Sequence, residues 1–498
     1  MSTGLERPEL PEGSTVVAGL GKSGMAAIGG ISAARPAGHI VAWDASSLGH
    51  VRDRARRLRR RGIETVVGMP IDAALDIAGT AAFVVRSPGI PWDAPPLLAS
   101  AARGLPVFDE LEVGWRLYRQ PWIGITGTDG KGTTATFTAA LLRRRISEVA
   151  VVGNYSHGPA ASDARNAEAE LIVCEVSSFQ LECADAFLPE VAVLTNLTRT
   201  HIRRHGACRR YAATKARMFV RGHRPAPVSV INIDDPFGAS LARHLRSLGG
   251  RVVSFGSDAS ADVRLLKCAW DAHGTAVVIS AGGRRASAHV RLTGRHNAMN
   301  AVAAIATVGV HGIDLDEACA VIGTIDGPPA RSQRIELGAP FDVFIDYAHT
   351  REGIIAVLTS LRTIVNSRPG ARLLALTGPL VLDEGSDDPL WATPIVGEYA
   401  DAVIVTTGHL SSMVTGPPIV VMAEMRRAGG VSEVILDRRS AIRQLVDTAR
   451  PGDVLLVLAR GDLSVIQADR AGTFVAFDDA AAVRDAYGQG DRTAQACR

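Results

Sequence analysis

Short apolar runs alternate with longer stretches rich in alanine, leucine and arginine along most of the chain. The first apolar runs have the length and composition of buried strands, and they cover residues 16–20, 40–43, 82–85, 122–125, 171–174, 191–194 and 228–231. Two of the intervening stretches, residues 135–145 and 209–221, have the character of helices. Strands and helices in alternation predict parallel sheets with helices on both faces, so we expect an α/β fold.

Two breaks in this pattern predict domain boundaries. Residues 119–121 (Arg-Gln-Pro) precede a new strand, and residues 327–330 (Gly-Pro-Pro-Ala) follow a helical stretch. The breaks divide the chain into predicted domains at 1–119, 120–328 and 329–498. The last domain resumes the alternation, with apolar runs at 343–345, 372–376, 402–405 and 454–458.

Composition and charge narrow the class of protein. Of 498 residues, 54 are basic and 51 acidic, so the formal net charge is only +3. That balance argues against a nucleic-acid or membrane-surface partner. Residues 1–13 lack the apolar segment of a signal peptide, and no apolar run reaches the length of a membrane span. The six cysteines show no metal-binding spacing, which fits a reducing compartment, and we expect a cytoplasmic protein.

One segment has the composition of a phosphate-binding loop. The strand at 122–125 leads into Thr-Gly-Thr-Asp-Gly-Lys-Gly-Thr-Thr, residues 126–134, and then into a helical stretch. Glycines let backbone amides turn toward phosphate oxygens, the helix start adds partial positive charge, and Lys131 can reach the outer phosphates. The residues expected to contact the nucleotide are Gly127, Thr128, Asp129, Gly130, Lys131, Gly132, Thr133 and Thr134.

This loop departs from the strict phosphate-loop pattern at both ends. Ile125 stands in place of the first glycine, and Gly132 replaces the hydroxyl residue after the lysine. Thr133 is therefore the nearest hydroxyl that could bind Mg²⁺. The structural alternative is an ordinary glycine-rich turn between a strand and a helix, which the combination of strand, glycines, lysine and helix disfavours.

Further segments, in the same order along the chain, resemble those of the Mur ligase family, which builds the peptide of the cell-wall precursor. The resemblance lies in the loop at 126–134, Cys-Glu-Val-Ser-Ser-Phe-Gln-Leu at 174–181, Thr-Asn-Leu-Thr-Arg-Thr-His at 195–201 and Tyr-Ala-Ala-Thr-Lys-Ala-Arg-Met-Phe at 211–219. It implies a catalytic set of Lys131, Glu175, His201 and Lys215. It also implies two Mg²⁺ sites, one held by Thr133 and Glu175 and the other by His201 and a carbamylated Lys215.

Lysine is scarce in this chain and occurs only at positions 22, 131, 215 and 267. Carbamylation requires a neutral amine that attacks CO₂. The pKa of a lysine can be lowered by its surroundings, whereas arginine stays charged. Lys131 and Lys215 thus stand where the resemblance implies that a lysine is chemically needed.

The resemblance also implies nucleotide and substrate contacts. Segments at 232–235 and 292–300 resemble central-domain motifs that reach the nucleotide, the segment at 333–336 resembles the start of the third domain, and the segment at 346–350 resembles a third-domain motif near the phosphates. This implies that ATP is contacted by Asn297, Asn300, Arg334 and Asp346. In the first domain, segments at 19–24, 87–90 and 108–112 resemble the branch of the family that adds glutamate to a UDP-linked muramoyl-alanine. The implied substrate contacts are Gly21, Lys22, Ser23, Asp44, Ser87, Gly89, Asn154, His349 and Arg351.

The implied fold is α/β with three domains: a Rossmann-like N-terminal domain for the UDP-linked muramoyl substrate, a central P-loop ATPase domain, and a C-terminal Rossmann-like domain for the amino acid. We expect a monomer. In the family reaction, the γ-phosphate of ATP is transferred to a substrate carboxylate, and an amine then attacks the acyl phosphate to give an amide, ADP and phosphate. The expected activity is glutamate addition in peptidoglycan precursor synthesis.

Other interpretations stay open. Gly-Leu-Gly-Lys-Ser-Gly at 19–24, followed by Asp44, is also a dinucleotide fingerprint that would indicate an NAD-dependent oxidoreductase. That interpretation leaves the lysines of the central domain without a role. Thr200 and Arg203 replace family aspartates, and no lysine follows residue 267. A diverged ligase with another donor or amino acid, or a nucleotide-binding homologue without activity, is therefore also considered. Arg351 and Arg460 could hold acceptor carboxylates, since arginine pairs with them through two hydrogen bonds.

Overall fold

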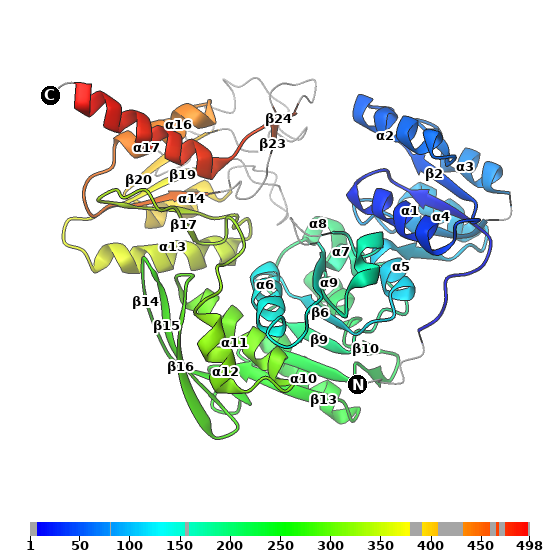
Figure 1. The fold of residues 1–498 in the computed structure, drawn as a ribbon, viewed down its shortest axis with the longest axis horizontal. Helices are drawn as coiled ribbons and strands as arrows, with labels where there is room; N and C mark the ends of the chain where they lie inside the picture. The colour runs from blue at the N-terminus through cyan, green and yellow to red at the C-terminus, as the bar shows by residue number, and fades with distance from the viewer. Residues whose placement is uncertain are drawn as a thin grey trace. The chain divides into compact units, whose positions relative to one another are not determined.

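The chain folds as an α/β protein with parallel sheets (Figure 1). The computed structural model describes residues 7–79, 81–154, 159–378, 391–406, 432–458, 465–467 and 474–496. It contains two compact units, the first made of Met1–Leu197, Arg204–Val263 and Ala303–Ile313 and the second of Thr198–Arg203, Arg264–Val302 and Asp314–Arg498. The predicted α/β class with parallel sheets is confirmed.

The first unit begins with a five-stranded sheet in the order β3-β2-β1-β4-β5, in which every strand pair is parallel. Successive strand residues point to opposite faces, so one set packs on α1, α2 and α5 and the other on α3 and α4. These elements are β1 (Ser14–Ala18), α1 (Lys22–Ala34), β2 (Ile40–Asp44), α2 (Gly49–Arg60), β3 (Glu64–Val67), α3 (Ile71–Ala78), β4 (Ala81–Arg86), α4 (Pro95–Ala102), β5 (Val107–Asp109) and α5 (Glu110–Leu117).

The same unit contains six parallel strands in the order β13-β12-β9-β6-β8-β7. Every residue of β6 and β8 is buried, as expected for inner strands of a parallel sheet. Because β6 lies between β9 and β8, the loops that follow these three strands meet at one edge. The elements are β6 (Trp122–Thr126), α6 (Lys131–Leu142), β7 (Val149–Gly153), a 3₁₀ helix (Ala164–Glu168), β8 (Leu171–Glu175), α7 (Ser178–Leu181), β9 (Val191–Leu194), α8 (Ile202–His205), α9 (Cys208–Ala216), β10 (Val220–Arg221), β11 (Arg224–Pro225), β12 (Val228–Asn232), α10 (Pro236–Ser247) and β13 (Arg251–Gly256).

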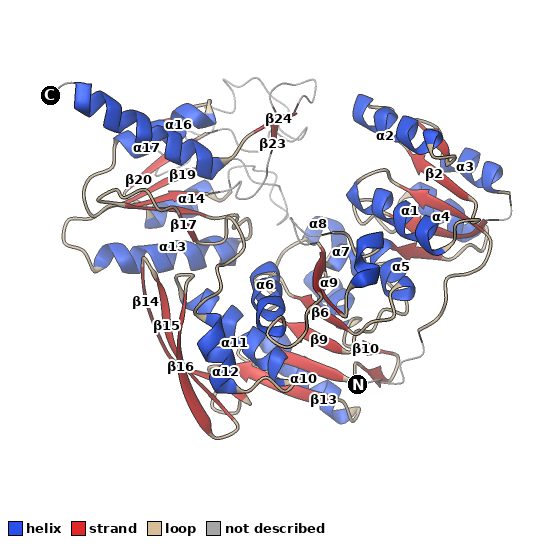
Figure 2. Ribbon diagram, viewed as in Figure 1, coloured by secondary structure: helices blue, strands red, loops and turns tan. Residues whose placement is uncertain are grey.

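The second unit combines a β-hairpin region with a third α/β sheet (Figure 2). Its larger sheet has the order β17-β18-β22-β19-β20-β21, parallel except for β17. Strands β15 and β16 form an antiparallel pair. The elements are β14 (Val263–Asp271), β15 (Gly274–Ala281), β16 (Arg284–Val290), α11 (Arg295–Gly309), α12 (Leu315–Ile322), β17 (Gln333–Arg334), β18 (Asp342–Ile345), α13 (Arg351–Asn366), β19 (Leu373–Thr377), α14 (Thr393–Tyr399), β20 (Ala402–Val405), β21 (Glu433–Val434), α16 (Arg438–Asp447), β22 (Val454–Val457), β23 (Val465–Gln467), β24 (Phe474–Ala476) and α17 (Asp479–Ala496).

Two details differ from the sequence expectations. The helix expected at 209–221 ends at Ala216, because Met218 and Phe219 turn into the central core and the chain continues as the β10–β11 hairpin. Gly222, with φ +58°, makes the turn of that hairpin. The antiparallel pair β15–β16 was also not anticipated, although Gly282 and Gly283 between its strands both have positive φ, which is typical of a hairpin turn.

Candidate functional site

The glycine-rich loop after β6 adopts a backbone that only glycine fits. Gly127 has φ +154°, and a β-carbon there would lie 1.9 Å from Thr195 Oγ1. Gly130 has φ +80° and immediately precedes α6, so Lys131 is the first residue of that helix. The expected order of strand, glycine loop, lysine and helix is present, with the helix start at the loop.

A second layer of side chains fixes this loop. The backbone N–H of Thr128 donates to Asn196 O at 3.0 Å, and that of Asp129 donates to Asn196 Oδ1 at 2.9 Å. Thr195 Oγ1 donates to Asp129 O at 2.7 Å. Neither Thr195 nor Asn196 was among the predicted site residues. Their position directly after β9, the neighbour of β6, is the signal that could have identified them.

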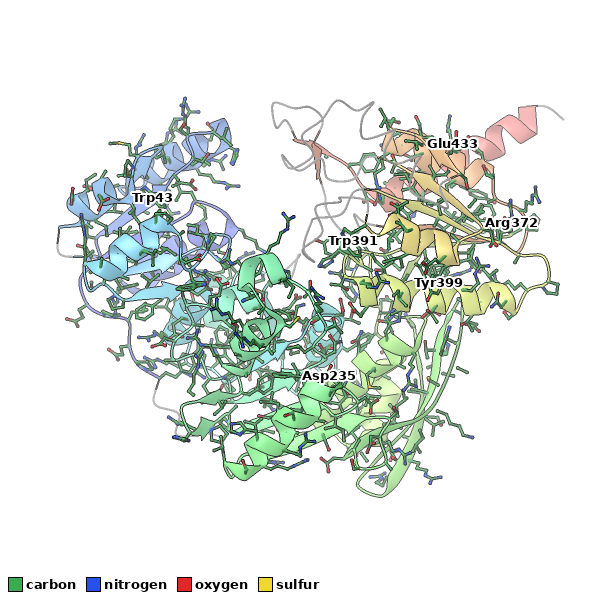
Figure 3. The ribbon with its side chains drawn as sticks, turned by 180° about the vertical axis from the view of Figure 1, so that it is seen from behind. Trp43, Asp235, Arg372, Trp391, Tyr399 and Glu433 are labelled. Atoms are coloured by element: carbon green, nitrogen blue, oxygen red, sulfur yellow. The ribbon has the colours of Figure 1, made fainter. Side chains whose placement is uncertain are left out.

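The residues after β12 support this layer in turn. Asn232 Nδ2 donates to Thr195 O at 2.8 Å. Asp235, labelled in Figure 3, accepts from Leu197 N at 2.9 Å and caps α10 by accepting from Gly238 N at 2.8 Å. The segment at 232–235, which the resemblance relates to the nucleotide, therefore reaches the loop through the chain at 195–197.

Lys215 lies beneath the loop and is almost fully buried, with 1% of its surface exposed. Its Nζ donates to Gly127 O at 2.8 Å and to Thr126 Oγ1 at 3.1 Å, and it lies 4.9 Å from the ring centroid of Tyr211. The Tyr211 hydroxyl is 3.1 Å from Thr128 Oγ1. Burial, reinforced by the charge of Lys131, lowers the pKa of Lys215 well below its ordinary value. The environment thus favours the neutral amine.

The other residues predicted for this site are close by. Lys131 Nζ donates to Thr128 O at 2.7 Å. Glu175, buried at the end of β8, accepts from Asn154 Nδ2 at 3.3 Å. The charges of Asp129 and Glu175 both act on Lys215, so these residues share one electrostatic environment. Thr133 and Thr134 are buried in the first turn of α6.

The predicted metal ligands are Thr133, Glu175, His201 and Lys215, and their grouping around Mg²⁺ stays a prediction. Within the described ranges, no group of three or more His, Cys, Asp and Glu side chains is arranged to hold a metal ion. His201 belongs to the second unit and has φ +56°, which is uncommon for a residue other than glycine. Its role beside Lys215 stays a prediction.

In the second unit, Asn297 and Asn300 lie on one face of α11, as expected from their spacing. Asn300 Nδ2 donates to Asn297 Oδ1 at 3.2 Å, and Asn297 Nδ2 donates to Thr293 O at 2.9 Å. Arg334 Nε donates to Asp342 Oδ1 at 2.7 Å, and Arg334 also forms an ion pair with Glu336. Asp342 and Glu336 thus balance the charge of Arg334, whose contact with the nucleotide stays a prediction.

The C-terminal motif at 346–350 forms a compact turn before α13. Asp346 is buried and accepts from Ser332 N at 2.5 Å and from Ala348 N at 2.6 Å. The rings of Tyr347 and His349 lie 4.9 Å apart. Arg351, the first residue of α13, is exposed. Asp346 therefore orders this turn. Arg460, the other arginine considered for an acceptor carboxylate, lies outside the described residues.

The N-terminal glycine loop follows β1 and is held by a carboxylate. Leu20 N donates to Asp44 Oδ2 and Ser46 N donates to Asp44 Oδ1, each at 2.8 Å. Gly21, with φ −73°, caps α1, whose first residues are Lys22 and Ser23. Both oxygens of Asp44 accept from backbone amides, whereas a dinucleotide-binding acid accepts from a ribose hydroxyl.

The loop at 87–90 packs beside it. Ser87 Oγ donates to Gly19 O at 3.1 Å, so Ser87 joins the two loops, while Gly89 is exposed. Lys22 lies within electrostatic reach of Glu110 and Glu175. The structure thus brings the predicted contacts of the N-terminal domain together at the carboxyl ends of β1, β2 and β4. Among the described residues, no helix has the combined length and apolar character needed to cross a membrane.

Comparison with known proteins places this geometry in a family. A profile of the Mur ligase middle domain matches residues 125–308, and one of the Mur ligase glutamate ligase domain matches residues 330–461. A UDP-N-acetylmuramoylalanine–D-glutamate ligase of Pelotomaculum thermopropionicum is 33% identical over 389 residues, which cover 75% of this chain and 78% of that protein.

One further relative is named for a different ligase reaction, and one solved structure shares the fold. A UDP-N-acetylmuramoyl-L-alanyl-D-glutamate–2,6-diaminopimelate ligase of Geobacter metallireducens is 31% identical over 390 residues, covering 68% of this chain and 73% of that protein. The MurF ligase of Thermotoga maritima, solved in complex with ADP, has the same fold with a TM-score of 0.59 and 16% identity, covering 91% of this chain and 94% of that chain. The chain belongs to the Mur ligase family, whose members are ATP-dependent ligases that form amide bonds.

Proposed function

We propose that the chain adds glutamate to UDP-N-acetylmuramoyl-L-alanine, with ATP activating the donor carboxylate as an acyl phosphate. The observation that carries the ATP-dependent chemistry is the buried amine of Lys215 against the phosphate loop, 2.8 Å from Gly127 O. The 33% identical relative, named as a D-glutamate ligase, supports the choice of donor and acceptor. Membership of a ligase family replaces the oxidoreductase interpretation.

The residues present suit the nucleotide and the metal that the family uses. Lys131 and the amides at the start of α6 would hold the outer phosphates. Thr133 and Glu175 would hold one Mg²⁺, and a carbamate on Lys215 with His201 would hold a second. When bound, Mg²⁺ supplies neutralisation of phosphate charge. The lowered pKa of Lys215 fits the formation of a carbamate, because the neutral amine is the form that attacks CO₂.

The work is divided among three domains in this proposal. Residues 1–119 would bind the UDP-linked donor, residues 120–328 would bind ATP, and residues 329–498 would bind the amino acid. The carboxyl ends of β1, β2 and β4 carry the proposed donor contacts Gly21, Lys22, Ser23, Ser87 and Gly89. Asp44 supports these contacts indirectly, since it orients the amides of the loop.

A second candidate is a Mur-type ligase that adds another amino acid. It is favoured by the motif at 346–349, which resembles that of the diaminopimelate- or lysine-adding relatives, although the Asp-Asn-Pro-Arg motif of those relatives is absent and no lysine follows residue 267. The relative of Geobacter metallireducens, 31% identical, is named for that reaction. In both candidates Arg351 is available for an acceptor carboxylate, because its side chain is exposed at the start of α13.

Phosphate release from ATP distinguishes these candidates. The purified chain is supplied with UDP-N-acetylmuramoyl-L-alanine and a panel that includes D-glutamate, L-glutamate and diaminopimelate. Glutamate addition predicts release that needs both the muramoyl nucleotide and glutamate. Release with another amino acid, and none with either glutamate enantiomer, would contradict the proposal.

A further inference from the structure

One buried and one partly buried arginine join the loop at 87–90 to helix α7, which follows Glu175. Arg86, at the end of β4, is fully buried, and Arg204, in α8, exposes 13% of its side chain. Both arginines meet the carboxylate of Glu182, at 2.7 Å from Arg86 Nη1 and 2.6 Å from Arg204 Nη2. We call Arg86, Glu182 and Arg204 the arginine bridge.

The arginine bridge holds the carbonyl groups of the loop at 87–90. Arg204 Nη2 donates to Pro88 O at 3.1 Å and to Ile90 O at 3.0 Å. Arg86 Nη1 donates to Ile90 O at 2.8 Å. These contacts act on a loop that also carries Ser87, whose hydroxyl donates to Gly19 O. The backbone of the predicted donor site is thus fixed from the side of the central domain.

The other end of the arginine bridge lies at helix α7, which follows the strand that carries Glu175. Glu182 is the C-cap residue of α7, and Arg86 also donates to Phe179 O within that helix. Ser177 is the N-cap residue of α7, and its side chain forms a capping box with Gln180. Only Val176 separates this cap from Glu175. A hydrogen-bonded connection therefore runs from the loop at 87–90 through Glu182 and α7 to the predicted Mg²⁺ ligand.

The positive and negative charges of this connection balance, and each charged side chain forms an ion pair with one of opposite charge. Arg86 also pairs with Asp109, which is buried, at 2.7 Å, so two arginines face two carboxylates. A buried ion-pair network of this kind contributes little net stability, because removing charges from water costs about as much as their attraction returns. It does fix geometry, because the planar guanidinium group donates in fixed directions.

We propose that Arg204 and Arg86 are positioning residues of the ligase: through Glu182 they set the donor loop at 87–90 relative to Glu175, so that the donor carboxylate meets the γ-phosphate of ATP. The proposal rests on the proposed donor site. Neither arginine needs to touch the donor. They affect the alignment of the donor with ATP, and a small displacement of either bound substrate lowers the rate of a reaction between them.

The test compares Arg204→Gln, Arg204→Lys and Glu182→Gln with the wild-type chain, using phosphate release with UDP-N-acetylmuramoyl-L-alanine and glutamate. For Arg204→Gln we expect kcat to fall and the donor KM to rise, each about tenfold, as for a misaligned donor. Affinity for a non-hydrolysable ATP analogue, measured by calorimetry, should stay within about twofold because the loop after β6 is untouched. Arg204→Lys keeps the charge without the planar fork and should recover part of kcat.

Arg209→Gln is the matched control, because Arg209 is an exposed arginine at the start of the neighbouring helix α9. It should retain wild-type parameters. Unchanged kcat and donor KM in both Arg204→Gln and Glu182→Gln would overturn the proposal. An equal loss of ATP-analogue affinity would also overturn it, since that result indicates general structural damage. Failure of the wild-type chain to turn over the muramoyl donor would instead overturn the proposed function.

Discussion

The chain carries two glycine-rich loops of similar design, one after β1 and one after β6. In each, a buried strand leads to a glycine and then to a helix whose first residue is lysine: Lys22 in α1 and Lys131 in α6. The glycines before the two lysines differ, since Gly21 has φ −73° and Gly130 has φ +80°. The second layers differ as well, because a carboxylate holds the first loop and a buried lysine lies beneath the second.

The two loops share a glycine-rich turn before a helix and differ in the side chains that surround this turn. Asp44 accepts from the amide of Leu20 in the first loop, which leaves a site suited to binding. In the second loop, Lys215 donates to Gly127 O and shares its environment with Lys131 and Glu175. Two lysines and a buried carboxylate therefore meet at the second loop, which is the arrangement that we propose for phosphoryl transfer.

The largest expected effect comes from the lysine of the second loop. Lys131→Ala should lower kcat by about 10²- to 10³-fold, because it removes a charge that acts on the transferring phosphoryl group. Phosphate release under saturating substrates measures it. Lys267→Ala is the control, since Lys267 is exposed on β14. Wild-type kcat in Lys131→Ala would contradict the proposal that the second loop, unlike the first, acts in phosphoryl transfer.

The two loops should also differ in how much a glycine-to-alanine substitution lowers the stability of the fold. Gly127→Ala should destabilise the fold by roughly 3 kcal/mol, because the new β-carbon would lie 1.9 Å from Thr195 Oγ1 at φ +154°. Gly21→Ala should cost no more than about 0.5 kcal/mol, since no atom lies within 4 Å of its β-carbon and its φ is negative. Chemical denaturation measures both. Equal costs would show that the second loop is not the more constrained one.

A buried acid near the first loop predicts a pH dependence. Glu110 accepts from Ser162 N and Ser162 Oγ, and burial raises the pKa of Glu110 to about 7. As pH rises from the ordinary pKa of a glutamate toward 7, the unfolded chain loses this proton and the folded chain keeps it, so stability falls.

Glu110→Gln removes this dependence. The variant should gain stability relative to wild type as pH rises from about 4.5 to 7, by on the order of 2 kcal/mol in total. Denaturation midpoints at a series of pH values measure the difference between the two chains. A difference that is constant across this range would mean that Glu110 ionises normally.

The smallest effect is expected for the lysine of the first loop. Lys22→Ala should raise the donor KM about tenfold, because one charge-assisted contact to a pyrophosphate is lost. With saturating donor, kcat should stay close to that of wild type, since the same interaction would be lost in ground state and transition state. A fall in kcat like that of Lys131→Ala would show that the two lysines act alike.

Local patterns in the sequence predicted eleven of the 24 strands in the described residues, most of them buried strands of the parallel sheets. The runs at 122–125, 171–174 and 191–194 became β6, β8 and β9 within one residue at either end. Short apolar runs carry this information because a buried strand of a parallel sheet needs apolar residues on both faces. The end of α9 was predicted poorly, because Phe219 continues the apolar pattern while packing beyond the helix.

The site was predicted less completely, for a physical reason. Glycines and a lysine mark the phosphate loop locally, but its support comes from Asn196, sixty-seven residues away in sequence. Arg86 and Glu182 are ninety-six residues apart. Neither pairing has a local signal, since it depends on which strands become neighbours. The scarcity of lysine drew attention to Lys215, but its burial beneath the loop required the fold.

Substitution of Lys215 is the most direct test of whether the buried amine beneath the second loop is needed for ATP-dependent activation. ADP affinity and phosphate release are measured together for Lys215→Ala and Lys215→Arg. We expect phosphate release to fall on the order of 10²-fold or more in both variants, while ADP affinity changes by no more than about threefold. Wild-type phosphate release in both variants would contradict it.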